Sequence, residues 1–283
     1  YGKPELGMID LASASISQST VALPTAFNQM LAFDANDQFV VGGSRGEVFS
    51  GANLDAPLSC GAVLSMAGAD EGTLALATAA GGIVLFDVSG DAPSYDTSLP
   101  LLSSHIALSN DGSRLAAAAI LTNAQYSPDR ALRVLSLPGA TELRAWPYQW
   151  GDTALFFDFT MSALGDHFGH QTGTFTQGAW VYTQRVLDLD NQQSFTRTSS
   201  SNGALRLSPD GQHVAVAEGN TTNLYDHGTL VDTFFGTPVA WLDDSHLLCS
   251  TGGSSVIYDA LGNPPTVTLA TGGGADTLEG TAG

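Results

Sequence analysis

Charged side chains are scarce in this sequence, and basic ones most of all. Lysine and arginine together number 9 against 28 aspartates and glutamates, so the formal net charge is −19 and charged residues make up 13% of the chain. Since so acidic a chain repels phosphate backbones and has few cations with which to displace counterions, we expect no nucleic-acid partner. A protein partner is expected to carry a basic surface.

Long apolar segments are also missing. No apolar run approaches the roughly 18 residues of a membrane-spanning helix, so we predict no membrane span. Hydrophobic residues still make up 43% of the chain, which is enough for a core and excludes intrinsic disorder. The first residue is Tyr1, and no charged-then-apolar leader follows it. With its single lysine and abundant Ser, Thr and Gly, the chain is expected to be an exported bacterial protein: secreted, periplasmic or at the cell surface.

Cysteine is nearly absent too. Cys60 and Cys249 lie far apart, and neither has a second cysteine or a histidine at metal-binding or redox-motif spacing. This excludes a zinc knuckle and a CxxC redox pair. Two buried free thiols are the favoured interpretation, and a disulfide between them is the alternative.

A repeated hairpin pattern organises the chain. In each copy, alternating apolar residues lead into a tight polar turn, and a second apolar run follows. Pro209, Asp210 and Gly211 show the turn chemistry most clearly, because proline presets φ and Asp-Gly tolerates positive φ. Six copies are predicted to be β-hairpins, at residues 31–41, 64–76, 106–118, 161–170, 205–217 and 239–248.

A third strand follows most hairpins and ends in an apolar residue and an aspartate. These strand ends lie at Asp87, Asp188, Asp226 and Asp259, with Asp10 as an isolated copy near the start. A fourth strand follows in most copies, and the repeat length is close to the roughly 40–45 residues of a four-stranded propeller blade. A small sheet with two apolar faces must be covered on both sides. We therefore predict an all-β fold, a β-propeller of four-stranded blades.

The turn Ser-Pro-Asp-Gly at 208–211 and strand ends such as Leu-Tyr-Asp at 224–226 resemble the repeats of known propeller families. The similarity is to WD40-like repeats and to the related bacterial YVTN-type and TolB-type repeats, over nearly the whole chain. It concerns the repeat pattern only, since the Gly-His and Trp-Asp signatures of eukaryotic WD40 proteins are absent. The resemblance implies the fold but not the function, because propellers include scaffolds, lactonases, lyases and dehydrogenase subunits.

The number of blades depends on the two ends of the chain. Residues 7–12 and 19–23 resemble the third and fourth strands of a blade that lacks its first two. Residues 271–283 suffice for about one further strand. We therefore favour seven blades, the last incomplete, over six with an additional amino-terminal hairpin. Residues 1–270 are predicted to form one propeller domain, and 271–283 a Gly-rich segment that either begins a closing strand or resembles an RTX tail.

Two segments carry oxygen ligands of the kind that calcium prefers. One contains Asp188, Asp190 and Asn191. The other is the tail around Asp276, which is similar to a single imperfect copy of the calcium-binding nonapeptide of RTX proteins. Neither has EF-hand spacing, and tight turns use Asp and Asn for backbone hydrogen bonds. Turn chemistry in the first segment and a flexible terminus in the second are favoured over calcium sites.

Several histidines occupy one repeated position. His167, His213 and His246 each follow a hairpin turn, where other copies have Thr73 or Arg114, so this position is expected to be a polar, solvated one. His167 and His170 are three residues apart, which places them on opposite faces of a regular strand. A metal pair at these two residues would require a bend.

The segment 165–178 is the most unusual part of the sequence, because it lengthens one blade and lies close to several aromatic residues. Insertions in repeat proteins map to loops on one face, which is often the binding face. We therefore predict an aromatic partner-binding surface, with gap filling between blades as the alternative role of these rings. The predicted residues are Trp146, Tyr148, Trp150, Phe175, Trp180 and Tyr182.

No catalytic nucleophile is apparent. The sequence has no Gly-x-Ser-x-Gly elbow, no Walker loop and no dinucleotide fingerprint. The favoured function is a non-catalytic binding or scaffold propeller, which presents loops and the aromatic surface to a protein partner or a larger assembly. The alternative is a hydrolase or lyase of a small sugar, lactone or phosphate ester with calcium at the channel mouth. Such an enzyme predicts that carboxylates and histidines from three or more blades converge there.

Overall fold

In a computed structural model, the residues that are described form strands and turns and no helices. These are residues 5–10, 15–22, 27–33, 38–43, 47–50, 53–59, 62–70, 72–87, 94–99, 101–121, 130–147, 154–190, 193–252, 254–261, 263–270 and 278–279. Accordingly, this part of the chain offers no helix that would suit a membrane crossing.

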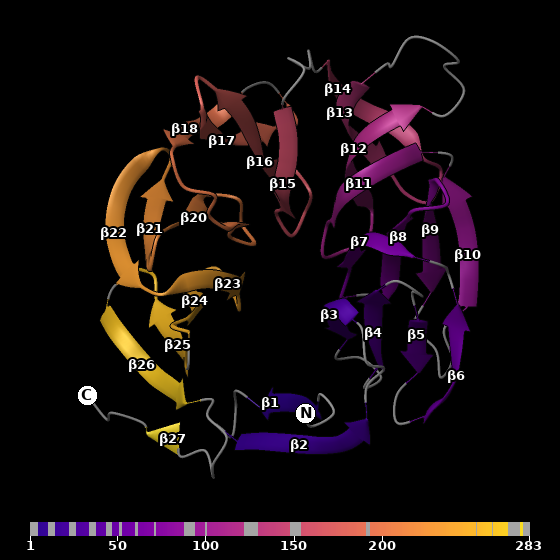
Figure 1. Ribbon diagram of the computed structural model, residues 1–283, viewed down its shortest axis with the longest axis horizontal. Helices are drawn as coiled ribbons and strands as arrows, with labels where there is room; N and C mark the ends of the chain where they lie inside the picture. The colour runs from indigo at the N-terminus through magenta and orange to yellow at the C-terminus, as the bar shows by residue number, and fades with distance from the viewer. Residues whose placement is uncertain are drawn as a thin grey trace.

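Six antiparallel sheets are arranged around a central axis, and each is a simple meander of consecutive strands (Figure 1). The first strands lie nearest the axis and are β3 (Phe27–Phe33), β7 (Val63–Gly68), β11 (Leu101–Leu108), β15 (Ala154–Met161), β19 (Leu205–Leu207) and β23 (Thr237–Trp241). The second strands are β4 (Gln38–Gly43), β8 (Thr73–Thr78), β12 (Arg114–Leu121), β16 (His167–Thr176), β20 (His213–Glu218) and β24 (His246–Ser250).

The outer half of each sheet completes the blade. The third strands are β5 (Glu47–Ser50), β9 (Gly82–Asp87), β13 (Arg130–Ser136), β17 (Ala179–Asp188), β21 (Thr221–Asp226) and β25 (Ser254–Asp259). The fourth strands lie at the periphery and are β6 (Asn53–Ser59), β10 (Ser94–Leu99), β14 (Thr141–Pro147), β18 (Gln193–Ser199), β22 (Thr229–Phe235) and β26 (Asn263–Ala270). The six predicted hairpins and the strand ends at aspartate are therefore present.

The two ends of the chain differ from the six blades. β1 (Glu5–Asp10) and β2 (Ser15–Ala22) form a two-stranded sheet of their own, which lies between the β3–β6 and β23–β26 blades (Figure 1). No described strand extends this small sheet. Near the carboxyl end, β27 (Leu278–Glu279) pairs with β26 as a fifth strand and does not join β1.

Backbone hydrogen bonds join the turns of successive blades on one face of the ring. The Asp70 amide donates to the Asn110 carbonyl at 2.8 Å, and the Asn110 amide donates to the Ala163 carbonyl at 2.9 Å. The Ala163 amide in turn donates to the Pro209 carbonyl at 2.7 Å. Because proline has no amide hydrogen, the next joint uses the Asp210 amide, which donates to a carboxylate of the following turn at 2.9 Å.

Each of three turns is also closed internally by a buried serine. In the clearest copy, the Ser208 hydroxyl accepts the His213 amide at 2.9 Å and donates to Asp210 Oδ1 at 2.6 Å. The same serine position is fully buried in all three turns, at Ser109, Ser162 and Ser208. The aspartate thus shapes the turn, in agreement with the turn chemistry read from the sequence.

The prediction of a solvated position was wrong for His213, which is 9% exposed and packs against Trp241 of the next blade, with ring centroids 6.2 Å apart. At two earlier joints, the residue at this position contacts the turn glycine of the next blade. A Cβ on Gly211 would lie 2.5 Å from Nδ1 of His167, and a Cβ on Gly165 would lie 2.8 Å from Cδ of Arg114. Both glycines have positive φ, at +76° and +68°. Glycine is therefore required at these positions for two reasons, the backbone conformation of the turn and the close approach of the neighbouring side chain.

Between neighbouring blades lies a cluster of buried apolar side chains. One joins the β7–β10 blade to the β11–β14 blade, a second joins the latter to β15–β18, and further clusters fill the next two joints. Phe168 and Leu224 are fully buried in two of them. Full burial of such a side chain contributes about 1.5–3 kcal/mol. Each sheet therefore depends on its neighbours for the cover of both faces.

Candidate functional site

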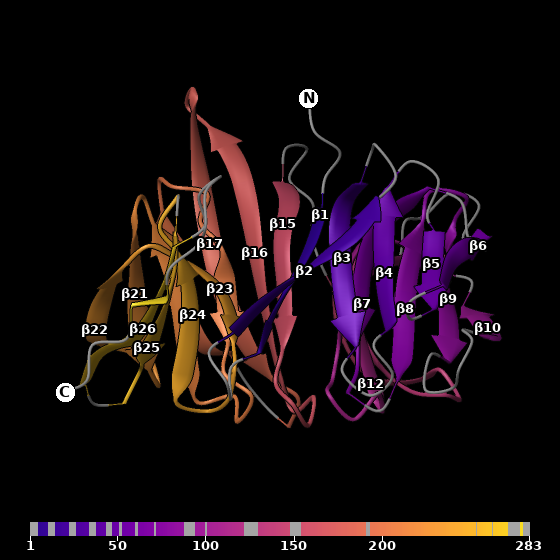
Figure 2. The same ribbon diagram turned by 90° about the horizontal axis from the view of Figure 1, so that it is seen from below.

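The β16–β17 hairpin extends beyond the other described blades on one face of the ring (Figure 2). Both strands have 10 residues, whereas β20 and β21 of the next blade have 6 each. The register runs without a break from His167↔Asp188 to Thr176↔Ala179. The additional length therefore comes from the unusual segment identified in the sequence.

Four aromatic rings gather on one face of this hairpin, and we call them the aromatic cluster: Phe157, Phe175, Trp180 and Tyr182. The Trp180 and Tyr182 rings stack with centroids 6.0 Å apart, and Phe175 meets Trp180 edge-on at 5.5 Å. Phe157 contacts Trp180 at 5.9 Å and Tyr182 at 5.3 Å, both edge-on. Such edge-to-face contacts each add about 0.5–1.5 kcal/mol beyond area burial, so the cluster is well ordered.

A glycine allows the cluster to pack. Gly173 lies opposite Tyr182 in the β16–β17 ladder, and a Cβ there would meet Phe157 at 2.5 Å. The Phe157 ring thus occupies the space above a strand position without a side chain. Phe175 remains 46% exposed at the edge of the cluster, and Trp180 and Tyr182 are half-buried.

Three of the six predicted aromatic residues thus come together in the aromatic cluster. Trp146 lies elsewhere, on β14, partly buried against the apolar cluster that joins the β11–β14 and β15–β18 blades. This is the gap-filling role that the sequence left open. Tyr148 and Trp150 lie outside the described residues. Phe157 was not predicted, because a register shift between Phe156 and Asp158 changes the alternation of β15 in a way that period-two reading does not anticipate.

A polar row connects the hairpin to the rest of its blade and to the next one. Asp158, Gln171, Gln184 and Arg197 lie directly opposite one another across β15, β16, β17 and β18. The Gln184 amide donates to Gln171 Oε1 at 3.0 Å, and Gln171 Nε2 donates to Asn202 at the start of the next blade at 2.5 Å. Both glutamines are fully buried. Buried hydrogen bonds of this kind hold the base of the hairpin in one orientation.

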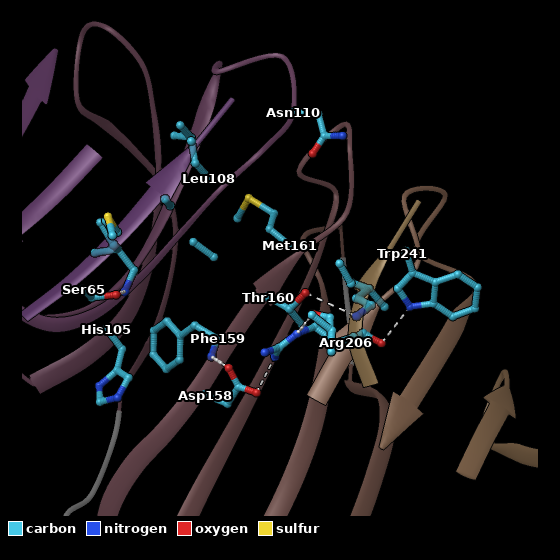
Figure 3. A pocket seen from close by; sticks show the side chains of 18 of the residues that line it. Ser65, His105, Leu108, Asn110, Asp158, Phe159, Thr160, Met161, Arg206 and Trp241 are labelled. Carbon is cyan, nitrogen blue, oxygen red and sulfur yellow. Dashed lines mark hydrogen bonds and ion pairs between the residues drawn. The ribbon is translucent and has the colours of Figure 1, made fainter. Parts of the chain in front are cut away.

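The central channel contains a cavity of about 640 Å³ whose described lining comes from β7, β11, β15, β19 and β23 (Figure 3). Asp158 and Arg206 form its main polar contact, with the guanidinium Nη1 2.6 Å from Asp158 Oδ2. The same Asp158 oxygen accepts the Leu205 amide at 2.8 Å, and Arg206 Nε donates to the Val239 carbonyl at 2.7 Å. The Trp241 indole closes the network by donating to the Arg206 carbonyl at 3.2 Å.

These contacts join three neighbouring inner strands, β15, β19 and β23. The innermost strands of different blades do not pair with one another as strands. Side chains therefore satisfy part of their backbone hydrogen bonding. Both Asp158 oxygens accept hydrogen bonds, since Oδ1 also accepts the Phe159 amide at 3.0 Å. The arrangement joins the blades, and the charged groups of Asp158 and Arg206 take part in these contacts.

His105 is the imidazole that lines the described part of the channel. Burial lowers the pKa of His105, and the Asp158 carboxylate opposes this shift only in part. The ring is therefore neutral at pH 7. The ring lies beside Phe159, with centroids 5.6 Å apart. Among the described residues, no group of three or more His, Cys, Asp or Glu side chains is placed to hold a metal ion.

The calcium candidates are described only in part. Asp188 ends β17, and its Oδ1 accepts the Asp190 amide at 2.7 Å, which is an Asp-type turn contact. Asn191 and Asp276 lie outside the described residues. His167 and His170 both lie on the regular strand β16 and so point to opposite faces of it. His170 is 1% exposed, and burial together with the charge of Arg185 lowers its pKa to about 3.

The turns opposite the hairpin tip carry most of the described carboxylates. In an antiparallel meander, the turn after the first strand and the turn after the third lie at the same edge, so these aspartates gather on one face. None of them is buried, and they are Asp70, Asp87, Asp111, Asp166, Asp188, Asp190, Asp210, Asp226, Asp243, Asp244 and Asp259. We call this surface the acidic face. Partial burial opposes the shift, but hydrogen bonds from Ser245 and His246 lower the pKa of Asp243 to about 2, so this carboxylate is charged at any physiological pH.

Comparison with known proteins adds to this description. No protein-family profile matches the sequence, and no curated protein matches it. Among solved structures, the Dos1 propeller superposes with a TM-score of 0.59 at 14% identity, over 93% of this chain and 78% of that one. The chain is a β-propeller. The propeller domain of Cps50 (Swd1) from Myceliophteria thermophila gives a TM-score of 0.48 at 10% identity, over 83% of this chain and 97% of that one.

The propeller fold predicted from the hairpin repeats is thereby confirmed. The sequence resemblance to WD40-like repeats is supported at the level of the fold. Likeness at this level of identity concerns the fold alone, so the function has to be argued from the surfaces of this chain.

Proposed function

We propose that this propeller is a non-catalytic protein-binding module and that the aromatic cluster on the β16–β17 hairpin is its docking surface. The observation that carries the proposal is the combination of protrusion and aromatic content. Phe175 is 46% exposed and the stacked Trp180 and Tyr182 lie beside it on a hairpin that extends beyond its neighbours (Figure 2). Exposed aromatic side chains that cluster on one surface are enriched at protein interfaces.

The rigidity of the hairpin favours binding. The buried Gln171–Gln184 pair fixes its base, and Phe157 supports the cluster from β15. A surface that is already ordered loses little conformational entropy when a partner docks on it. The aromatic cluster is therefore prepared for docking before the partner arrives.

The channel gives less support to catalysis. Asp158 is engaged by Arg206 and by two backbone amides. The alternative enzyme requires carboxylates and histidines from three or more blades at the channel, whereas the described lining offers Asp158 and His105, from two neighbouring blades. The Asp158–Arg206 pair joins neighbouring blades, as a scaffold requires.

We also propose that the partner has a basic surface. The net charge of −19 and the aspartates of the acidic face create a negative potential that steers cationic surfaces toward the propeller. Association is therefore expected to weaken as the salt concentration rises. The aromatic contacts depend much less on salt.

The test compares three baits in native pull-downs from extracts of the cells that make the protein. Replacement of Phe175 and Trp180 together by alanine should reduce partner capture at least tenfold, because loss of two interface anchors costs about 2 kcal/mol or more. The matched control is Val181→Ala. Val181 is 41% exposed on the same strand but on its opposite face, so this variant should retain the partner. Equal capture by all three baits would show that the hairpin is not the docking surface.

A further inference from the structure

The outer strand of the β19–β22 blade exposes more large apolar side chains than the described parts of β14 and β18. On β22, Leu230 is 53% exposed, Val231 52% and Phe235 59%. β22 is the last strand of its sheet, and within the described residues no strand pairs with its outer edge. Proteins usually protect such edges with charged side chains or proline, so an apolar exposed edge requires an explanation.

The neighbouring blade shows how such an edge is covered in this protein. On β26, the backbone of Thr268 and Leu269 pairs with Glu279 and Leu278 of β27, so the outer edge there carries a fifth strand. β26 and β22 are equivalent in register. Each pairs with a third strand through a ladder with one irregularity, between Ile257 and Asp259 in one blade and between Leu224 and Tyr225 in the other.

This equivalence identifies the matching positions on β22. Thr268 lies opposite Val256, and Thr233 lies opposite Asn223 at the same place in its own blade. Leu269 and Phe234 correspond in the same way. The Thr233 amide donates to Asp232 Oδ1 at 2.7 Å, an exposed carboxylate. At this position, where β26 receives its fifth strand, an added strand would supply a backbone carbonyl in place of that carboxylate.

A groove lies beside this edge. It has a volume of about 520 Å³ and runs between β22 and the turn after β25, with Val231, Phe235 and Leu261 among its apolar lining. Side-chain contacts hold β22 against β25 at the groove. Phe234 stacks on Tyr258 with centroids 4.7 Å apart, and the Tyr258 hydroxyl donates to the Phe235 carbonyl at 2.9 Å. Apolar side chains of an added strand would find complementary surface here.

The charges of the groove indicate the chemistry of the occupant. Asp226 and Asp232 line it, together with the imidazole of His213, and Nδ1 of His227 lies 2.5 Å from Asp226 Oδ1. No lysine or arginine is among the lining residues. An added strand with lysine or arginine between its apolar residues would therefore complement the groove.

We propose that the edge of β22 at Thr233–Phe234 binds an extended, basic-apolar peptide segment of a partner protein as a fifth strand of the blade. The backbone of the peptide pairs with the free edge, its apolar side chains lie on Val231 and Phe235, and its cations lie against the two groove carboxylates. This is β-strand addition, in which the backbone supplies affinity and alternate side chains supply specificity. The site is separate from the aromatic cluster, so the two proposals stand or fall independently.

The experiment uses the full chain and a capped, fluorescently labelled peptide of sequence KVTVKVT. Two control peptides accompany it: EVTVEVT, which reverses the charge, and KVTVKVT with N-methyl groups on alternate residues, which cannot form a strand ladder. We expect saturable binding of the first peptide, with at least tenfold weaker binding of both controls. Hydrogen–deuterium exchange should show protection confined to residues 229–235 when the first peptide is bound.

Protein variants locate the binding site. Val231→Lys should weaken binding at least tenfold, and Asp232→Asn about threefold, which is the effect of losing one solvent-exposed charge pair. The matched control is Leu143→Lys on β14, a 46% exposed position on the outer strand of another blade, which should bind like the wild type. All of these side chains are exposed, and melting temperatures verify that the variants remain folded.

Three outcomes would overturn the proposal. Equal binding of the N-methylated peptide would exclude strand addition, and exchange protection elsewhere would exclude this edge. Absence of peptide binding together with a concentration-dependent dimer that Val231→Lys abolishes would assign the edge to a second copy of the chain. Loss of pull-down capture on mutation of the aromatic cluster has no bearing on any of these results.

Discussion

The joint between successive turns predicts a measurable cost for one additional methyl group. At Gly211 the backbone has φ of +76°, and a Cβ would lie 2.5 Å from Nδ1 and 2.7 Å from Cγ of His167 in the preceding blade. Gly211→Ala therefore adds two penalties. An alanine in this backbone region costs roughly 1–2 kcal/mol, and displacement of the imidazole from a packed joint costs about 1–3 kcal/mol more.

A control within the same blade separates these penalties. Gly219, in the turn between β20 and β21, also has positive φ, at +63°, but a Cβ there would meet nothing within 4 Å. Gly219→Ala therefore carries only the backbone penalty, reduced by the lower entropy of the unfolded alanine chain. We expect Gly219→Ala to destabilise by about 1 kcal/mol and Gly211→Ala by about 2–4 kcal/mol. For a chain of this size, 1 kcal/mol lowers the melting temperature by about 2–4 °C.

The assay is thermal unfolding at pH 7, followed by calorimetry, on both single variants and on Gly211→Ala combined with His167→Ala. Removal of the imidazole gives the new methyl group room, so the double variant should be about 1–2 kcal/mol more stable than the sum of the single effects predicts. Equal melting temperatures for the two glycine variants, or strict additivity with His167→Ala, would refute the idea that this joint couples the blades.

Further predictions concern titration, thiol reactivity and the channel. The pKa of His170 is about 3 in the folded chain and about 6.5 in the unfolded chain, so between these values the unfolded chain binds a proton that the folded chain excludes. The free energy of unfolding should therefore fall by about 1.4 kcal/mol per pH unit below pH 6.5. His170→Gln should reduce that slope in melts measured as a function of pH. The Asp243 carboxyl should titrate near pH 2 by NMR, in accord with its lowered pKa; a midpoint near 4 would contradict its turn hydrogen bonds. Cys249 is buried and free, and burial raises the pKa of its thiol, so mass spectrometry should find it unalkylated until denaturant is added. Asp158→Asn should destabilise by about 1–3 kcal/mol because Arg206 loses its charged acceptor, and an unchanged denaturation midpoint would exclude a structural role for the pair.

Local signals in the sequence were sufficient for the elements of the fold. Asp-Gly turns between alternating strands predicted the hairpins, and the aspartate at the end of the third strand marked the position of that strand, as at Asp226 and Asp259. Period-two alternation and turn residues depend on nearest neighbours only, so they can be read directly. The mutual cover of the blades followed from the apolar character of both sheet faces.

Contacts between blades could not be read in the same way. The burial of His213 depends on a neighbouring blade, and the place of Phe157 in the aromatic cluster depends on a register shift in β15. The pairing of β27 with β26 also joins segments whose partner the sequence does not indicate. The number of blades was the hardest feature to predict from the sequence, since it depends on where both ends of the chain lie. In the described residues, six sheets of at least four strands stand beside the two-stranded β1–β2 sheet.

The hydrogen bonds that link successive turns have an evolutionary consequence. The residues that meet there, Asp70, Asn110, Ala163 and Pro209, range from a carboxylate to a methyl group, because the link is made by peptide groups. Natural selection can therefore exchange almost any residue at these positions, and whole blades can be duplicated or replaced, while the hydrogen bonds between successive turns persist. A protein assembled in this way can diversify its surfaces freely and still inherit the same ring.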